Sequence, residues 1–313
     1  TLIIIESTLA PGTMQDVVKP ALGTLDGDPS DYIYLAHCPE RVQPGRLLET
    51  LFTRPRVVGG MTPQAGKLAA QLYRQITSGE VDETDCLTAE IVKTAENAYR
   101  DVQIAFANTL ALLCEDLGAD VWRVRELVNK CPYRNVHEPG AGVGGHCIPK
   151  DPWLLIANAE NSNGKHLIWA ARRVNEYMAY HMIGLLSDAL SEAEVPITQA
   201  RIVVLGYSYL PGSADTRNTP SEVVVSWLRE HAAEVRVHDP YVAKYAQPLQ
   251  QVLQGADACV IMTAHPEYKE AVLLLLTATM RHKILIDGRN AVGPLAAQVA
   301  GLLYREVGVG TGR

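Results

Sequence analysis

Short apolar runs alternate with amphipathic stretches over the first quarter of this chain. The runs cover residues 2–5, 32–36 and 56–60, and the spacing over 62–72 predicts a surface helix. A strand that is buried on both faces of a parallel sheet reads as such a run, because both of its faces meet apolar layers. The pattern therefore predicts three strands, which is half of a doubly wound sheet.

The same alternation returns in the last third of the chain, after Pro196. Strands are expected over 201–206, 234–239, 258–262 and 283–287, with a helix over 221–230. Alternating strands and helices imply a parallel sheet with right-handed crossovers. We expect residues 308–313 to form a loose tail.

Between these two regions the apolar residues recur with a helical period. One helix is expected from Thr84 onward, another over 121–128 and a long one over about 165–193. At 1.5 Å per residue the long helix would span about 40 Å, which is more than one small domain requires. We expect it to join two domains, and we hypothesise that it pairs with its copy in a dimer.

The predicted fold class is therefore α/β, with two doubly wound, Rossmann-like parallel-sheet domains joined by a central helical region. The predicted domain boundaries are 1–80, 81–196 and 197–313. The chain opens on the apolar run itself, without an initiator Met, so the first domain is expected to be truncated.

Composition narrows the class of protein. A chain of 313 residues with 47% hydrophobic and 20% charged residues is typical of a soluble globular protein of about two domains. The net charge of −7 disfavours nucleic acid as a partner. Six dispersed cysteines without a C-x-x-C pair indicate neither a zinc site nor a disulfide framework, and they fit a reducing cytoplasm. No metal site and no membrane span are expected.

A glycine-rich stretch, residues 140–152, carries the strongest chemical signal. Four glycines in six positions allow a tight wall around a ligand, since each lacks a Cβ. Cys147 follows at once, and Lys150 and Asp151 come shortly after it. A thiol beside a cation can be a nucleophile, whereas the alternative is a buried structural cysteine.

Polar turns follow the first strands, where ligands of open α/β sheets bind. The turn over 6–13 contains several hydroxyls, and the loop over 37–45 contains two prolines and a glycine. The alternative for Ser7 or Thr13 is that it caps the next helix. Arginines at the later strand ends suit a phosphate group, although surface ion pairs would look the same.

Lys93 and Asn97 lie four residues apart, so they are on one face of the helix that is expected from Thr84. Two such side chains can reach one ligand. The alternative is that this polar face is simply solvated.

Five motifs in order resemble the UDP-glucose/GDP-mannose dehydrogenase family, over essentially the whole chain. They are Glu6-Ser-Thr-x-x-Pro-Gly-Thr13, Pro39-Glu-Arg-x-x-Pro-Gly45, Lys93-x-x-x-Asn97, Gly144-Gly-His-Cys-x-x-Lys-Asp151 and Gly206-x-x-Tyr-x7-Arg-x-x-Pro-Ser221. The resemblance implies an enzyme that oxidises the C6 alcohol of a nucleotide sugar to a carboxylate and reduces two NAD. It also implies that Cys147 carries a thiohemiacetal and then a thioester.

The resemblance assigns further roles. Lys93 stabilises the developing oxyanion, Asn97 positions that oxygen, Asp151 and Thr8 organise the reacting water, and Glu40 assists hydrolysis. The implied cofactor contacts are Ser7, Thr8, Lys150 and Arg217. The implied substrate contacts are Arg41, Val42, Lys93, Asn97, Gly144, Gly145, Arg289 and Arg134, the last of these reaching the substrate from the partner subunit.

The chain also departs from the family pattern. Pro44 stands where glucose-oxidising members have a glutamate, and together with His146 it resembles the N-acetylhexosamine branch. Leu210 stands where a lysine usually binds the substrate phosphate. No Gly-x-Gly-x-x-Gly precedes Thr1, so we expect the chain by itself to bind NAD poorly and to turn over negligibly.

The predicted function is an NAD-dependent 6-dehydrogenase of a UDP-N-acetylhexosamine, with UDP-N-acetylmannosamine as the leading candidate. It would be a cytoplasmic homodimer or higher homo-oligomer. The alternatives are a nucleotide-sugar-binding or oligomerisation module without redox activity, and a UDP-glucose 6-dehydrogenase.

Overall fold

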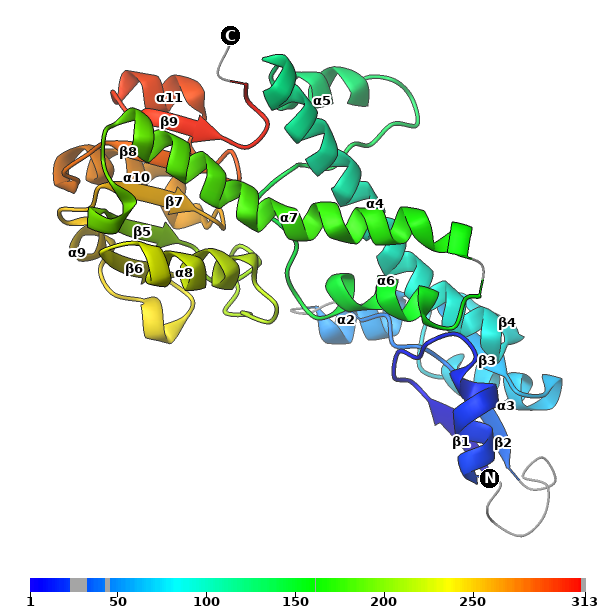
Figure 1. Cartoon of the computed structure of the whole chain (residues 1–313). Helices are drawn as coiled ribbons and strands as arrows, with labels where there is room; N and C mark the ends of the chain where they lie inside the picture. Colours follow the sequence, from blue (N-terminus) through cyan, green and yellow to red (C-terminus); the bar gives the residue numbers. More distant parts are fainter. Residues whose placement is uncertain (23–32, 43–45, 161, 311–313) are drawn as a thin grey trace. The chain divides into compact units, whose positions relative to one another are not determined.

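The computed structural model describes residues 1–22, 33–42, 46–160 and 162–310 (Figure 1). It divides into two compact units, Thr1–Arg100 with Lys150–Trp169 and Asp101–Pro149 with Ala170–Arg313. The start of the strand expected over 32–36, as well as Pro44, falls outside the described residues. The three predicted domain boundaries stay a prediction.

A four-stranded sheet forms the centre of the first unit. Its strands follow one another in sequence order, β1 (Leu2–Ile5), β2 (Tyr34–His37), β3 (Arg56–Gly60) and β4 (Val81–Asp85). The pairs β1–β2 and β3–β4 are parallel, whereas β2 and β3 are antiparallel. The sheet is therefore mixed.

This sheet corrects the expected half of a parallel sheet at two points. The antiparallel pairing of β2 with β3 was not predicted, because a buried apolar run does not encode its own direction. The strand β4 was missed because its sequence, VDETD, is polar and its side chains are exposed or half-buried. Residues 84 and 85 consequently end a strand and do not begin a helix.

Short helices connect the strands of this sheet. They are the π-helix η1 (Met14–Val18) with α1 (Lys19–Leu22), then α2 (Leu47–Thr53) and α3 (Pro63–Tyr73). The expected helix over 62–72 is confirmed as α3, which Thr62 caps by accepting from the Ala65 N–H. A Cβ on Gly60 would lie 2.3 Å from the Gly66 nitrogen, so glycine is required where β3 touches α3.

Four further helices follow, namely α4 (Cys86–Leu117), α5 (Val121–Asn129), α6 (Cys147–Ala157) and α7 (Ser162–Glu192). The helix expected over 121–128 and the long helix expected over 165–193 are confirmed as α5 and α7. At 31 residues, α7 is about 46 Å long. The helix α6 was not expected, because the glycine stretch that precedes it indicated a loop.

The second unit contains a five-stranded sheet in the order β6-β5-β7-β8-β9, and every neighbouring pair is parallel. The strands are β5 (Arg201–Leu205), β6 (Glu234–His238), β7 (Ala258–Ile261), β8 (Ile284–Asp287) and β9 (Leu303–Glu306). The predicted parallel sheet is confirmed for four strands. The fifth, β9, was missed because its sequence, LYRE, is short and ends in two charged residues, so it is not an apolar run.

Helices cover both faces of this sheet. They are α8 (Pro220–His231), α9 (Leu249–Leu253), α10 (Pro266–Thr279) and α11 (Pro294–Val299), with 3-10 turns at Ile197–Gln199 and Ala243–Tyr245. Buried residues of α7 and α8 pack on alternate side chains of the strands, and those of α9 and α10 pack on the others. The strands are thus buried on both faces, as their apolar runs predict.

The expectation of a loose tail is wrong for residues 308–310. The Gly308 N–H donates to Glu115 Oε1 at 2.6 Å, and the Gly308 carbonyl accepts from the Val121 N–H at 2.8 Å. With φ at +85°, Gly308 approaches so closely that a Cβ would lie 2.1 Å from Val121 Cγ1. Gly308 and Gly310 therefore allow close packing here, although a glycine-rich chain end is usually flexible.

Glu306 ends β9 as a buried carboxyl beside Asp287 of β8. Within the described part of the chain, neither carboxyl oxygen of Glu306 has a hydrogen bond of normal geometry. Burial raises the pKa of Glu306 to about 8, the charge of Asp287 adds to this, and Tyr304 and Trp122 oppose it. In the folded protein at neutral pH, the Glu306 carboxyl is therefore mostly protonated and uncharged.

We predict that Glu306 makes stability fall as pH rises. Its folded pKa lies above the unfolded value, so this stabilisation is complete below about pH 4.5 and is lost as pH rises to about 8. The slope in that window is as much as about 1.4 kcal/mol per pH unit. Glu306→Gln should flatten the pH dependence of the free energy of unfolding. The exposed Glu230→Gln should not, and an equal slope in both variants would contradict the prediction.

Candidate active site

The turn after β1 carries the predicted residues Ser7 and Thr8, and Glu90 of α4 fixes it. The Glu90 carboxylate accepts from the Gly12 N–H and from the Met14 N–H, each at 2.7 Å. Ser7 is exposed and Thr8 is half-buried. Thr13 bonds the Ala10 carbonyl at 2.6 Å and makes no capping bond, so the capping alternative is wrong for Thr13.

Sequence reasoning missed Glu90. Its side chain is buried, and its partners lie 76 and 78 residues away, so no local motif marks it. Burial raises the pKa of Glu90, while the two backbone N–H groups oppose the shift. The only sequence signal was a glutamate one turn before Lys93 on the buried side of a long helix.

The carboxylate of Asp151, on α6, is bonded by Asn97 from α4 and by its neighbour Lys150. Asn97 Nδ2 donates to Asp151 Oδ2 at 2.6 Å, and Lys150 Nζ donates to Asp151 Oδ1 at 2.6 Å. Asp151 is fully buried. Both carboxylate oxygens are thus held by donors, and the predicted residues Asn97, Lys150 and Asp151 form one cluster. A carboxylate held in this way can orient a reacting water.

Glu40 follows β2, and its backbone N–H donates to the Glu6 carbonyl at 3.0 Å. Its Oε1 is enclosed and, among the described residues, accepts no hydrogen bond. Burial raises the pKa of Glu40, while the charges of Lys93 and Arg56 oppose the shift. Lys93 is buried on α4, and its positive charge acts to lower the pKa of Glu40.

Arg41 and Val42 come next to Glu40, and both are half-buried. Arg41 forms an ion pair with Glu96 of α4 and also donates to the Pro55 carbonyl at 3.1 Å. Its guanidinium is therefore held by the protein. The predicted substrate contacts of Arg41 and Val42 stay predictions.

The glycine loop begins with three backbone anchors in the second unit. The Gly140 N–H donates to Asn108 Oδ1 at 2.9 Å, and the Ala141 N–H donates to the Gly288 carbonyl at 3.1 Å. The Gly142 carbonyl accepts from Arg289 at 2.9 Å. These contacts fix the path of the loop before it reaches Cys147.

Arg289 holds this loop through its guanidinium. It also donates from Nε to the Met262 carbonyl at 2.9 Å, so two of its groups bond backbone oxygens. Burial lowers the pKa of Arg289 to about 10. Arg289 thus anchors the glycine loop, and its predicted contact with the substrate stays a prediction.

The next part of the loop lies against Tyr209. A Cβ on Gly144 would lie 2.4 Å from Tyr209 Cβ, and one on Gly145 would lie 3.0 Å from the Tyr209 ring. The Gly145 N–H donates to the Arg217 carbonyl at 2.8 Å, and the Gly145 carbonyl accepts from Asn218 at 3.1 Å. Only glycine fits at these positions, as the sequence predicted.

Cys147 is the first residue of α6 and is exposed. The alternative of a buried structural thiol is therefore wrong for Cys147, although it holds for Cys38, Cys86, Cys114 and Cys259. Arg217, whose backbone carbonyl bonds the Gly145 N–H, pairs through its side chain with Asp215 at 2.5 Å.

A buried polar network lies behind the loop. Arg172 of α7 pairs with Asp101 of α4 at 2.7 Å, and Asn175 bonds Asp101 at 2.8 Å and Asn108 at 2.9 Å. Asn108 in turn holds Gly140. Sequence reasoning missed this network, because polar residues on long helices usually indicate a solvated face.

Arg134 lies exposed in the segment before Gly140 and donates to the Pro132 carbonyl at 3.5 Å. Its predicted role in a partner subunit's site stays a prediction.

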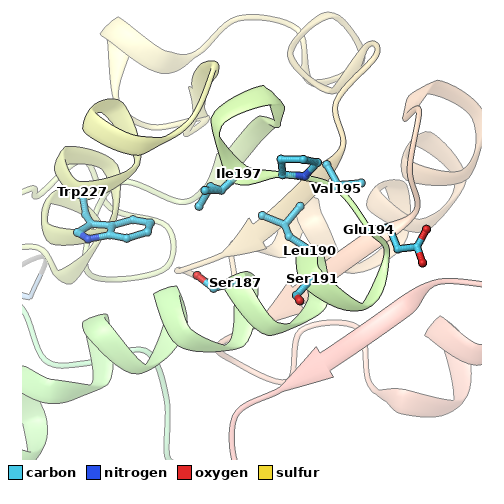
Figure 2. Close-up of a pocket in the computed structure, with 8 residues that line it drawn as sticks. Ser187, Leu190, Ser191, Glu194, Val195, Ile197 and Trp227 are labelled. Atoms are coloured by element: carbon cyan, nitrogen blue, oxygen red, sulfur yellow. The ribbon is translucent and has the colours of Figure 1, made fainter.

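In the described part of the chain, no three His, Cys, Asp or Glu residues are placed to hold a metal, and no helix is long and apolar enough to cross a membrane. A pocket of about 440 Å³ lies between the end of α7 and Trp227, lined by serines and aliphatic side chains with one carboxylate, that of Glu194 (Figure 2). It contains none of the predicted site residues.

Three domains of the UDP-glucose/GDP-mannose dehydrogenase family match this chain. The NAD binding domain matches residues 1–77, the central domain 87–177 and the UDP binding domain 203–294. The matches confirm the resemblance that the five motifs predict.

Individual proteins agree with these domain matches. The UDP-N-acetyl-D-mannosamine dehydrogenase of Pyrococcus horikoshii is 44% identical over 311 residues, which are 99% of this chain and 73% of that protein. Its solved structure superimposes with a TM-score of 0.91 over 99% of this chain and 73% of that chain. The NDP-N-acetyl-D-galactosaminuronic acid dehydrogenase of Methanosarcina mazei gives 35% identity and a TM-score of 0.90, over 98% of this chain and 69% of that chain. These structures confirm the predicted α/β fold.

We predict that Glu90→Gln loosens the turn over residues 6–13. An amide offers one acceptor where the carboxylate offers two, so one backbone N–H should face an NH₂ group. We expect a loss of about 1–3 kcal/mol in the free energy of unfolding and faster hydrogen exchange at Gly12 and Met14. Glu96→Gln, at the exposed ion pair on the same helix, should cost about 0–1 kcal/mol. Unchanged exchange at Gly12 and Met14 would show that Glu90 does not hold the turn.

Proposed function

We propose that this chain, which belongs to the UDP-glucose/GDP-mannose dehydrogenase family, is an NAD-dependent 6-dehydrogenase of UDP-N-acetylmannosamine. The family assignment supports an NAD-dependent UDP-sugar dehydrogenase. The sugar is proposed from the Pyrococcus horikoshii relative, which is named for UDP-N-acetyl-D-mannosamine, and from His146 in the glycine motif. The observation that carries the proposal is Cys147, an exposed thiol at the first position of a helix after a glycine loop.

The residues present suit the cofactor. Ser7 is exposed at the carboxyl end of β1, where open sheets bind nucleotides. The side chains of Lys150 and Arg217 keep 35% and 59% exposure, so both cations remain accessible to phosphate oxygens although each pairs with an aspartate. When bound, NAD supplies the acceptor for the hydride that each oxidation removes.

The chain's own groups carry the remaining chemistry. The Cys147 thiolate bonds to the C6 carbon of the aldehyde and gives a thiohemiacetal, whose oxygen is the oxyanion that the family motif assigns to Lys93. Loss of the second hydride from C6 gives a thioester. Water then attacks C6, the C–S bond breaks, and the acid and the free thiolate are released. The buried Asp151, held by Asn97 and Lys150, orients that water, and Glu40 takes its proton.

We also propose a cytoplasmic homodimer. The described cysteines are free thiols, which fits a reducing compartment. Tyr177 and Tyr180 on α7 are 50% and 56% exposed, and aromatic side chains of this kind are enriched at interfaces. A monomer mass in light scattering would contradict the dimer.

Replacing the Cys147 thiol should abolish the oxidation to the acid without weakening the binding of UDP. Cys147→Ala removes the nucleophile, so formation of the uronic acid by the full-length protein should fall by about 10³-fold or more, while UDP binding by calorimetry should be retained. Cys131→Ala, at the other exposed thiol, should leave turnover unchanged. Two NADH per substrate from Cys147→Ala would refute the thioester route.

The sugar assignment is tested by comparing kcat/KM for UDP-N-acetylmannosamine, UDP-N-acetylglucosamine, UDP-N-acetylgalactosamine and UDP-glucose. We expect UDP-N-acetylmannosamine to exceed UDP-glucose by at least about tenfold, since a site built for an acetamido group leaves polar groups unpaired with a hydroxyl. A preference for UDP-glucose would overturn the assignment and leave the family unaffected.

A further inference from the structure

The loop after β5, residues 206–212, forms one wall beside the glycine loop. Its Tyr209 is the side chain that would clash with a Cβ at either Gly144 or Gly145. The backbone of Gly145 is also bonded on both sides, through its N–H to Arg217 and through its carbonyl to Asn218. Gly145 lies two residues before Cys147, so the position of Tyr209 constrains the approach to the thiol.

Asp239, at the end of β6, holds the first half of this wall loop. Its Oδ2 accepts from the Tyr207 N–H and the Ser208 N–H, each at 2.8 Å, and from the Ser208 hydroxyl at 2.9 Å. Burial alone would raise the pKa of Asp239, but hydrogen bonds from His265 and the backbone lower it to about 2. Asp239 is therefore a buried anion that holds the backbone of the wall loop.

His265, which precedes α10, connects the two halves of the wall loop. Its Nδ1 accepts from the Gly212 N–H at 3.1 Å, so the ring proton lies on Nε2. Nε2 then donates to Asp239 Oδ2 at 3.1 Å, and it lies 3.2 Å from the Ser208 hydroxyl. His265, Asp239 and Ser208 are all fully buried.

These three residue types also make up hydrolytic triads, but the geometry here excludes that chemistry. In a triad the serine and the aspartate bond opposite nitrogens of the ring. Here both bond Nε2, and no part of Ser208 is accessible to a substrate. The arrangement holds backbone and contains no nucleophile.

We propose that His265, with Asp239, is a positioning residue for the Cys147 thiol. It fixes the wall loop at Ser208 and Gly212, the loop fixes Tyr209, and Tyr209 sets the glycine backbone that leads into α6. The expected effect on turnover rests on the proposed function, whereas the expected effect on the glycine loop does not. The alternative is that His265 merely stabilises the second sheet.

The test is His265→Phe in the full-length protein, which removes both nitrogens and keeps a ring between Tyr241 and Tyr268. The matched control is His282→Phe, because His282 is also paired with an aspartate, Asp257, but is 40% exposed. It precedes the amino end of β8, whereas His265 follows the carboxyl end of β7. Hydrogen exchange at the Gly145 amide, without substrate, reports the glycine loop. Steady-state kinetics separate kcat from KM.

We expect His265→Phe to speed exchange at Gly145 by at least about tenfold and to lower kcat by about 10- to 100-fold, with less change in KM for the UDP-sugar. His265→Gln places an amide donor near Asp239 and should recover part of both effects. His282→Phe should leave Gly145 exchange and kcat at the wild-type values. If His265→Phe does not fold, Ser208→Ala removes only the hydroxyl and should shift both readouts in the same direction by less.

The proposal is overturned if the folded variant lowers Tm but leaves Gly145 exchange and kcat equal to those of His282→Phe. Because the exchange experiment uses no substrate, its result stands apart from the proposed function. Failure of the proposed function would appear instead as no turnover of UDP-N-acetylmannosamine by the wild-type protein.

Discussion

The site depends on one steric constraint, which is that the backbone before Cys147 touches other groups at distances that no Cβ allows. At Gly140 a Cβ would lie 2.5 Å from Arg289 Nη1, and at Gly144 it would lie 2.4 Å from Tyr209 Cβ. Because glycine has no side chain, the N–H and carbonyl groups of this backbone can come close enough to bond side chains and strand ends of the second unit. The loop is consequently fixed by hydrogen bonds along its length, and α6 begins at a defined point with an exposed thiol.

Carboxylates fix the surrounding turns by a common device. Glu90 accepts two backbone N–H groups and Asp239 accepts four, while Asp151 accepts from an amide and an ammonium. A buried carboxylate costs free energy unless donors surround it, and with donors it holds flexible backbone in one place. The same physics explains the polar residues inside α4 and α7, where Arg172 pairs with Asp101 and Asn108 supports Gly140.

Sequence alone predicts the strands, helices and motifs that are encoded by residues adjacent in the chain. The apolar runs of β5, β7 and β8 predict strands because both faces of each are buried, and the ordered motifs identify Cys147, Lys150 and Asp151. The strands β4 and β9 escape because VDETD and LYRE are not apolar runs. Glu90, Asp101 and His265 escape for another reason. Their partners lie 26 to 78 residues away, and only the tertiary fold brings them together.

Among the described residues, both carboxyl oxygens of Glu306 and one of Glu40 are buried without a hydrogen bond, and the neighbouring charges of the two side chains differ in sign. Glu306 faces the anion Asp287, which adds to the effect of burial and keeps it protonated near neutral pH. Glu40 is also raised in pKa by burial, but the cations Lys93 and Arg56 oppose the shift. The cations beside Glu40 favour its carboxylate form, whereas the anion beside Glu306 disfavours it. Of the two, Glu40 is therefore the better candidate for a base in the proposed thioester hydrolysis, and Glu306 suits the packing of the sheet edge.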